Sequence, residues 1–191
     1  MKRIYLAGPE VFLSDAVSIG DQKKKICEAY GFEGIFPLDN ILELNEPSPQ
    51  ENGLKIGRAN EELIESCDIV IANMTPFRGA SCDVGTAYEM GFGKALGKTV
   101  LAYSNNSDLF LKRNLDQLPN AKQVDEQTYV DGIGMTLENF GLIDNLMLDN
   151  AVSGPIELEN VGVFYDQTDV YRNLRAFIRC LEQLKSDAKA A

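Results

Sequence analysis

Histidine is absent from this sequence of 191 residues. Its absence excludes Ser-His-Asp and Cys-His catalysis, histidine-ligated metals and proton transfer by imidazole. An enzyme with this composition has to work with carboxylates, tyrosine, lysine or arginine, and we expect neither a metal nor another cofactor. The four cysteines lack CxxC spacing, which is typical of reduced, mostly buried thiols in a cytoplasmic protein; they are Cys27, Cys67, Cys82 and Cys180.

Positive charge is also scarce. The chain has 18 Lys and Arg against 29 Asp and Glu, a formal net charge of −11. Such a surface repels nucleic acid polymers and anionic membranes, because no excess of cations is available to neutralise phosphates. No apolar run approaches the length of about 18 residues that a membrane-spanning helix needs, and the start MKRIYLAGPE turns polar too early for a signal peptide. A small neutral substrate remains compatible with this charge.

Short apolar runs alternate with stretches of helical spacing in the first half of the chain. The runs predict strands over residues 3–7, 32–37, 69–74 and 99–103, and the spacing predicts helices over residues 14–30, 54–67 and 83–96. This alternation is the pattern of an α/β fold with a doubly wound, mainly parallel sheet and flanking helices, and the length suits a single domain. Ligands bind such sheets beyond the carboxyl ends of the strands, where residues 8–12, 38–40 and 75–83 would meet.

The second half of the chain has a weaker pattern. Residues 104–166 are rich in Asn, Asp and Gly, so we expect an irregular insertion or lid there, with one strand near residues 162–165. Residues 38–53 contain two prolines and many polar side chains, which predicts a long loop. A final amphipathic helix is expected over residues 169–184, within a terminal segment of residues 167–186.

Glu89 is the sharpest local signal. It is the only charge in the ten residues VGTAYEMGFG, and its neighbours four positions away are Gly85 and Gly93. Because a glycine inside a helix is unfavourable by about 1 kcal/mol, two glycines beside one carboxylate indicate that space is needed there. Either the glycines clear space for a ligand beside Glu89, or they allow a neighbouring element to pack closely; the pattern alone leaves both open.

Three further residues have both a structural and a functional interpretation. Asp83 is placed to cap the helix that follows it, and at the rim of the sheet it could also touch a ligand. Tyr5 lies within a predicted central strand, where a core position is usual, yet its hydroxyl could reach Glu89 and favour the ionised carboxylate. Asn60 lies among glutamates and is most simply a surface residue.

Four segments together resemble the nucleoside 2-deoxyribosyltransferase family: IYLAGPEVF, SCDIVIANMTPFRG, DVGTAYEMG and GLIDNLM. The resemblance covers residues 3–103 closely and a second patch around residues 139–150. Its most specific element is DVG-x-x-x-E. It implies an enzyme of nucleoside salvage that moves a 2-deoxyribosyl group from a deoxynucleoside to a free nucleobase, by ping-pong transfer with retention of configuration.

The resemblance assigns roles to the residues that match. Glu89 corresponds to the nucleophile that forms a covalent deoxyribosyl-enzyme, Tyr5 to the tyrosine that holds this carboxylate, and Asp83 to the aspartate that contacts the substrate. The remaining substrate-binding positions are Gly8, Phe12, Pro37, Asp39, Asn60, Gly85, Asn145 and Met147. The segment with Asn145 and Met147 corresponds to one that a neighbouring subunit contributes, which implies an obligatory homo-oligomer.

One departure from the family pattern concerns proton donation. Asn60 stands where some members carry an aspartate, and an amide cannot protonate a leaving base as a carboxylic acid does. Two alternatives to the transferase stay open. One is an N-glycoside hydrolase of 2′-deoxynucleoside 5′-monophosphates, for which Arg78, Ser81 and Thr86 would bind the phosphate. The other is a non-catalytic nucleotide-sensing module, which would not need a nucleophile.

Overall fold

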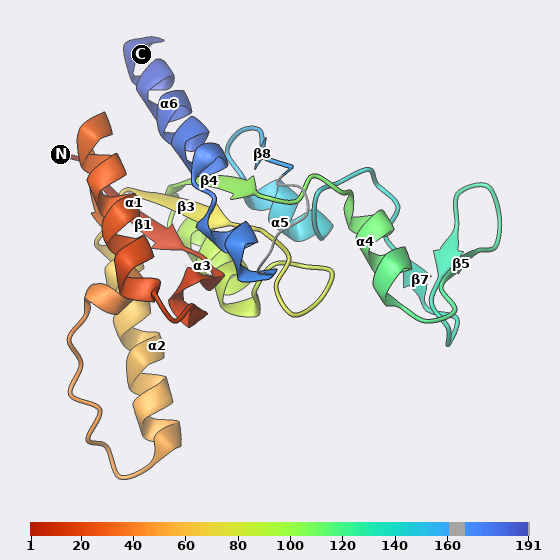
Figure 1. Cartoon of the computed structure of the whole chain (residues 1–191), viewed down its shortest axis with the longest axis horizontal. Helices are drawn as coiled ribbons and strands as arrows, with labels where there is room; N and C mark the ends of the chain where they lie inside the picture. The colour runs from red at the N-terminus through yellow and green to blue at the C-terminus, as the bar shows by residue number, and fades with distance from the viewer. Residues whose placement is uncertain (161–166, 191) are drawn as a thin grey trace.

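The computed structural model describes residues 1–160 and 167–190 and contains a five-stranded parallel sheet (Figure 1). The strands stand in the order β2-β1-β3-β4-β8 and comprise β1 Arg3–Ala7, β2 Glu33–Ile35, β3 Ile69–Asn73, β4 Thr99–Ser104 and β8 Glu157–Leu158. The chain moves outward from β1 to β2 and then returns to the other side of β1. This reversal opens the crevice beyond the carboxyl ends of β1 and β3 in which ligands of such folds bind.

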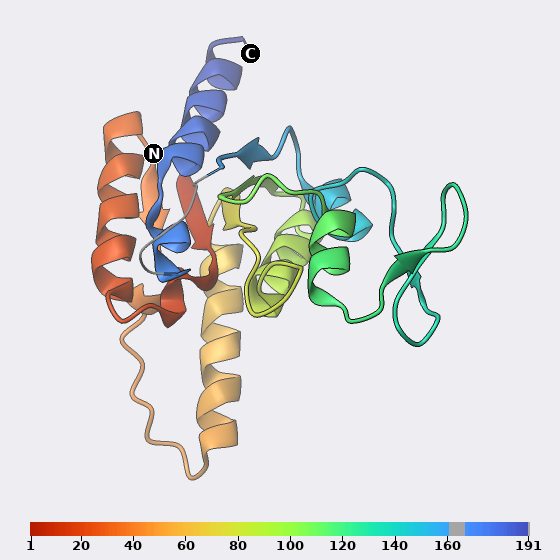
Figure 2. The same ribbon diagram turned by 45° about the vertical axis from the view of Figure 1, so that its right-hand side comes forward.

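Helices cover both faces of the sheet (Figures 1 and 2). One face packs against α1 Ala16–Tyr30 and α6 Arg175–Ala190, and the other against α2 Pro49–Glu65, α3 Val84–Ala95 and α5 Leu146–Ala151. The predicted doubly wound α/β fold is therefore confirmed.

Strand alternation decides which side chains meet which helices. In β1, Ile4 and Leu6 belong to the core beneath α1 and α6, whereas Tyr5 and Ala7 belong to the core beneath α2 and α3. Successive side chains of a strand point to opposite faces. Tyr5 therefore points toward the helix that carries Glu89.

The loop predicted over residues 38–53 is shorter than expected. A 3-10 turn forms at Pro37–Asp39, and α2 begins at Pro49. The residues Ser48-Pro49-Gln50-Glu51 explain the early start, because the Ser48 hydroxyl accepts a hydrogen bond from the backbone N–H of Glu51 at 3.2 Å and proline is favoured in the first helical turn.

Residues 104–166 were predicted to be an irregular insertion, and the described part of the segment combines long stretches of turns and loops with several short regular elements. It contains α4 Phe110–Gln117, α5, strand β8 and a small antiparallel sheet of β5 Lys122–Gln123, β6 Tyr129–Val130 and β7 Thr136–Leu137. These elements are only two to eight residues long, too short for a periodic pattern to register. The small sheet lies away from the main sheet (Figure 1). The strand expected near residues 162–165 falls outside the described residues.

The terminal helix begins later than predicted. Gln167–Arg172 form a 3-10 turn, and α6 starts at Arg175. The side-chain amide of Asn105 donates hydrogen bonds to the backbone carbonyls of Val170 and Asn173 at 2.7 and 2.9 Å. These carbonyls are thereby tied to the end of β4 rather than to the next helical turn, a contact that local sequence does not reveal.

The four cysteines are buried free thiols, as expected. Burial raises the pKa of Cys27, Cys82 and Cys180 to about 12, which makes these thiols unreactive at neutral pH. Within residues 1–160 and 167–190, no helix is long and apolar enough to cross a membrane.

Candidate active site

Tyr5 and Glu89 are joined by a short hydrogen bond. The Tyr5 hydroxyl donates to Glu89 Oε1 over 2.6 Å, between residues 84 positions apart in the sequence. Tyr5 is completely buried in β1, and Glu89 is partly buried in α3. Strand β1 pairs with β3, and α3 packs on β3. The sheet topology therefore fixes both ends of this contact.

The environment of Glu89 favours its protonated form more than water does. Burial raises the pKa of the Glu89 carboxyl from an ordinary 4.5 to about 7, and the negative charges of Asp83 and Glu10 add to this rise. The hydrogen bond from Tyr5 and the positive charge of Lys23 lower the pKa and oppose the burial. Near neutral pH the carboxyl therefore titrates, and its ionised form is poorly solvated and held in one orientation.

Asp83 caps α3, and its negative charge also raises the pKa of Glu89. Its Oδ2 accepts a hydrogen bond from the backbone N–H of Thr86 at 3.0 Å. A Cβ placed on Gly85 would lie 2.9 Å from that same oxygen, so glycine keeps the space beside the carboxylate clear. Gly93 allows α3 to pack closely on the sheet, since a Cβ added at this position would lie 2.8 Å from the Val70 side chain of β3. Gly93 thus fits the close-packing interpretation, and space for a ligand beside Glu89 stays a prediction.

A buried polar cluster lies beside this pair and was missed in the sequence. Glu10 follows β1 in the 3-10 turn Pro9–Phe12, and its Oε1 accepts hydrogen bonds from Lys23 Nζ and the Tyr103 hydroxyl, each at 2.9 Å. All three side chains are fully buried. A Cβ on Gly8 would lie 2.0 Å from Glu10 Oε2, so the close approach of this carboxylate requires glycine. As with Glu89, the signal for Glu10 was a single charge in an apolar run, LAGPEVF.

Phe12, in the turn that follows β1, belongs to an aromatic stack. Its ring stacks on Phe77 with 5.2 Å between centroids, and the Arg78 guanidinium lies over both rings at 5.1 and 4.5 Å. Phe12 is still 55% exposed, so one face of the aromatic surface is available. The stack joins the segments after β1 and β3, which the sequence placed on the same rim.

The remaining predicted positions lie in the turn after β2 and on α2. Asp39 has both oxygens engaged, accepting from the Phe36 backbone N–H at 2.9 Å and from Lys24 Nζ at 2.6 Å. Its carboxylate thus holds the turn that includes Pro37. Asn60 is partly exposed on α2. Next to it, Glu61 accepts a hydrogen bond from the Tyr88 hydroxyl of α3, which fixes this part of α2 beside the helix of Glu89.

Asn145 and Met147 open α5. The Asn145 amide donates to Glu138 Oε1 at 2.5 Å, while its oxygen accepts from the Met147 backbone N–H at 3.0 Å. Met147 is 65% exposed. In the described part of the chain, the Asn145 side chain is hydrogen-bonded to Glu138 and to the Met147 backbone rather than to Tyr5 or Glu89. This arrangement is compatible with a segment that faces another subunit, and the subunit contact itself stays a prediction.

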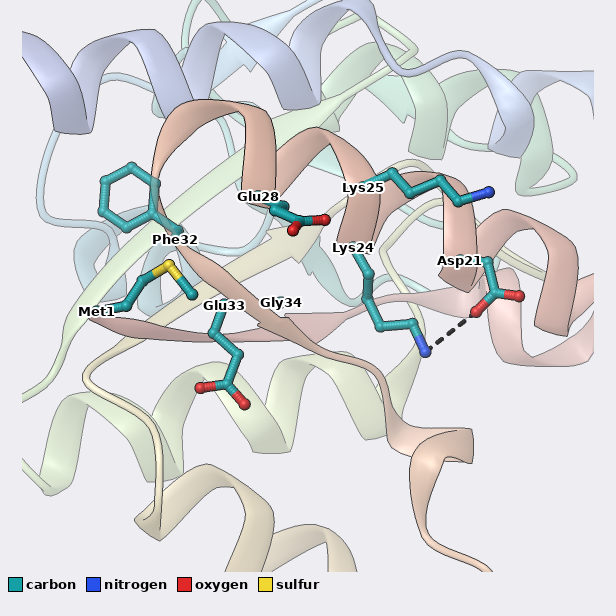
Figure 3. A pocket seen from close by; sticks show the side chains of 8 residues that line it. All are labelled: Met1, Asp21, Lys24, Lys25, Glu28, Phe32, Glu33 and Gly34. Carbon is teal, nitrogen blue, oxygen red and sulfur yellow. Dashed lines mark ion pairs between the residues drawn. The ribbon is translucent and has the colours of Figure 1, made fainter.

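A surface pocket lies on another part of the molecule (Figure 3). It has a volume of about 490 Å³ and lies between α1 and β2, with Met1, Lys24, Glu28 and Phe32 in its wall. None of the predicted site residues lines it. The volume of this pocket therefore does not lead to the predicted residues, and Tyr5 and Glu89 form the candidate site on chemical grounds.

Comparison with known proteins is decisive for the family. The model of the family described as nucleoside 2-deoxyribosyltransferase matches residues 4–147, which include Tyr5, Asp83, Glu89 and Asn145. The chain belongs to this family. The match to the nucleoside 2-deoxyribosyltransferase family ends at residue 147, so the terminal helix α6 lies outside the matched region.

Individual relatives agree with this assignment. A solved structure of a 2-desoxiribosyltransferase from Leishmania mexicana is 28% identical, with 95% of this chain and 98% of that chain covered and a TM-score of 0.63. A conserved protein from Enterococcus faecalis V583 is 18% identical over 96% of this chain and 98% of that one, with a TM-score of 0.50, and shares the fold alone.

The curated relative is longer. An uncharacterized protein of Schizosaccharomyces pombe is 35% identical over 109 residues, which are 56% of this chain and 52% of that protein. The chain thus spans about half the length of the curated relative that it matches.

Proposed function

We propose that this protein transfers a 2-deoxyribosyl group between nucleobases, with Glu89 as the nucleophile. The observation that carries the proposal is the 2.6 Å hydrogen bond from the Tyr5 hydroxyl to Glu89 Oε1, on a carboxyl whose pKa burial raises to about 7. A partly buried, poorly solvated carboxylate held in one orientation suits attack on a sugar carbon. Membership of the nucleoside 2-deoxyribosyltransferase family supports the substrate class.

The first half-reaction breaks the N-glycosidic bond. The free oxygen of Glu89 bonds to C1′ as the C1′–N bond breaks, and the bonding electron pair leaves with the base, which takes up a proton. The transition state has oxocarbenium character, and the adjacent carboxylate stabilises its positive charge. The Tyr5 hydroxyl stays on Oε1 and keeps the carboxylate in place.

The second half-reaction reverses the first with a different base. A ring nitrogen of the incoming base attacks C1′, the ester bond to Glu89 breaks, and the nitrogen loses its proton. Two inversions at C1′ give net retention of configuration. Water attacking the same ester would give hydrolysis instead, so access of water decides between transfer and cleavage.

The other site residues take supporting roles in the proposal. The stack of Phe12, Phe77 and Arg78 offers a planar apolar surface for the base. Asp83 contacts the sugar beside the space that Gly85 leaves, and Asn60 hydrogen-bonds the substrate without serving as an acid. Asn145 and Met147 cover the site of a neighbouring subunit in a homo-oligomer, and residues 104–166 act as its lid.

A transfer assay tests the function. The protein is incubated with a 2′-deoxynucleoside and a different free base, and the products are separated by chromatography. We expect the new deoxynucleoside to accumulate. Free sugar and base without the new nucleoside would identify a hydrolase, and no turnover with any donor–acceptor pair would leave the sensing module as the better interpretation.

The phosphate-binding set of the hydrolase alternative is mostly engaged within the protein. The Ser81 hydroxyl donates to Asp144, Thr86 is buried at the helix cap, and Arg78 lies over the rings of Phe12 and Phe77. No specific observation favours a 5′-monophosphate over a nucleoside, and the transferase remains the proposal.

Replacing Tyr5 with phenylalanine is expected to move the acid limb of the pH profile. The Tyr5 hydrogen bond lowers the pKa of Glu89, so its loss raises that pKa, and a hydrogen bond to a charged group corresponds to about one pKa unit. The profile of kcat/KM against pH should fall at a pH about one unit higher than in the wild type. Tyr88→Phe is the matched control, since Tyr88 donates to Glu61 rather than to Glu89. If the acid limb lies at the same pH in the wild type, Tyr5→Phe and Tyr88→Phe, the role of Tyr5 in setting the pKa of Glu89 is wrong.

A further inference from the structure

A buried ion pair fastens the entrance of α3 to the segment that bears Asn145. Arg113 of α4 lies with Nη2 3.2 Å from Asp144 Oδ2, and both side chains are almost fully buried. Neither residue was singled out in the sequence. The pair is distinct from Tyr5 and Glu89 but lies next to Asp83, because Asp144 contacts the two residues that precede it.

Asp144 reaches across to the chain just before the catalytic helix. Its Oδ2 accepts a hydrogen bond from the Cys82 backbone N–H at 3.0 Å, and its Oδ1 accepts from the Ser81 hydroxyl. Oδ1 also accepts from the backbone N–H of Asn145 at 2.8 Å. One carboxylate thus bonds on one side to the residues that lead into Asp83, and on the other to Asn145.

Arg113 also binds the chain before α3 and the segment before Asn145. Its Nε donates to the Ala80 carbonyl at 2.7 Å, and its Nη2 donates to the Ile143 carbonyl at 2.5 Å. A third bond from Nη1 to the Asp108 carbonyl at 2.8 Å anchors the guanidinium to the start of its own helix. The planar, five-donor guanidinium suits this task, because it fixes several acceptors in one plane.

We propose that Asp144, braced by Arg113, is a positioning residue that sets Asp83 and the segment of Asn145 relative to each other. A buried ion pair gives little net stability, because desolvation offsets much of its attraction, so the value of this pair lies in geometry. The inference rests on the proposed role of Asp83 in the transfer reaction. It extends that role by linking the helix entrance to the segment expected to serve a neighbouring subunit.

The test compares Asp144→Asn with Asp149→Asn. Asp149 is a matched control, since its two oxygens accept from the backbone N–H groups of Ile143 and Asp144 at 3.1 and 2.8 Å and so hold the same segment through bonds that do not involve Ser81 or Cys82. In Asp144→Asn the new amide group faces donors, so bonds to the helix entrance are lost. We expect kcat/KM to fall tenfold to a hundredfold, on the order expected for a small misplacement of a substrate-contacting group, and expect a much smaller change in the control.

The pH profile separates positioning from simple loss of structure. The charged groups that shift the pKa of Glu89 are Asp83 from its own helix, Glu10 from the turn after β1 and Lys23 from α1, with Tyr5 as the hydrogen-bond donor. Of these, only Asp83 depends on the anchor. Its displacement removes part of the rise in the pKa, so the acid limb should move to lower pH in Asp144→Asn and stay in place in Asp149→Asn.

Backbone hydrogen exchange gives a readout that does not need turnover. Amides of residues 82–86 should exchange faster in Asp144→Asn than in Asp149→Asn, and Ser81→Ala, which removes one bond only, should lie between them. If Asp144→Asn and Asp149→Asn have the same acid limb and the same exchange rates at residues 82–86, the positioning role of Asp144 is wrong. If the wild type fails to transfer, the proposed function is wrong, and the exchange comparison alone still decides whether Asp144 holds the helix entrance.

Discussion

Replacing Glu89 with alanine is expected to abolish deoxyribosyl transfer, lowering kcat/KM by on the order of 10⁴-fold or more, while the protein stays folded. The variant loses the carboxylate that bonds to C1′. Among the described residues, the Tyr5 hydroxyl donates to Glu89 over 2.6 Å and to no second carboxylate that could replace Glu89 as the nucleophile. Glu62→Ala is a suitable control, because Glu62 is an exposed acidic residue on α2. Initial rates of new nucleoside formation measure both. Transfer at the wild-type rate in Glu89→Ala would refute the mechanism.

A trapped intermediate gives a direct view of the same step. A 2-fluoro-2-deoxynucleoside donor forms the ester but releases it slowly, because fluorine destabilises the oxocarbenium-like transition state. Mass spectrometry of the digested protein should find one added fluorodeoxyribosyl group on the peptide that contains Glu89, and none in Glu89→Ala. Labelling of a different peptide would place the nucleophile elsewhere.

The same carboxylate should lower stability above neutral pH. Its pKa in the folded protein is about 7, raised from 4.5, so the folded state binds this proton more tightly than the unfolded state does. Stability from this group is therefore complete below pH 4.5 and lost as the pH rises through 7. The rise in the pKa corresponds to at most about 3.4 kcal/mol. Glu89→Gln should remove this loss, and its unfolding free energy should exceed that of the wild type at pH 8 but not at pH 4.5.

The central sheet could be predicted because its strands are continuous apolar runs. The apolar runs predicted at residues 69–74 and 99–103 correspond to β3 and β4, which are buried on both faces, and such strands are recognisable from their composition alone. The start of α6 could not, because it depends on Asn105 binding the carbonyls of Val170 and Asn173 from 65 and 68 positions away. The start of α2 was available in the residues Ser48 to Glu51, but two nearby prolines suggested a loop.

Some residues of the candidate site could likewise be predicted from the sequence, and others could not. Glu89 could be found because it is a lone charge in an apolar helix, and Tyr5 because neighbouring parallel strands bring β1 to α3. Glu10 carries the same kind of signal and was overlooked. Asp144 lies in a segment rich in Asn, Asp and Gly, where an acidic residue is usually solvated, so only the tertiary contact with Arg113 distinguishes it.

Lys23 shows a limit of pattern analysis. It is the first of three consecutive lysines, and Lys23 is fully buried, Lys24 is partly buried and Lys25 is exposed. Nothing in the sequence KKK tells them apart. Lys23 is selected by its direction on α1, toward Glu10 at 2.9 Å and the ring of Phe177 at 5.1 Å. A charge buried this deeply is rare unless it is paired.

Replacing Lys23 with methionine is therefore expected to lower the unfolding free energy by about 3–5 kcal/mol, because it leaves the Glu10 carboxylate buried without its counter-charge. Urea denaturation at pH 7 measures the change. Lys25→Met, on the same helix but exposed, should change stability by less than about 0.5 kcal/mol.

The double variant Glu10→Gln/Lys23→Met separates loss of the pair from loss of packing. It removes the unpaired charge while the Tyr103 hydroxyl can still donate to the glutamine oxygen that replaces Glu10 Oε1. We expect it to recover most of the stability that Lys23→Met loses, as buried ion pairs exchanged for neutral groups commonly do. A single variant as stable as the wild type, or a double variant less stable than Lys23→Met, would show that the burial of Glu10 does not depend on Lys23. Because both charges also act on the pKa of Glu89, the buried pair of Glu10 and Lys23 also belongs to the electrostatic setting of the proposed nucleophile.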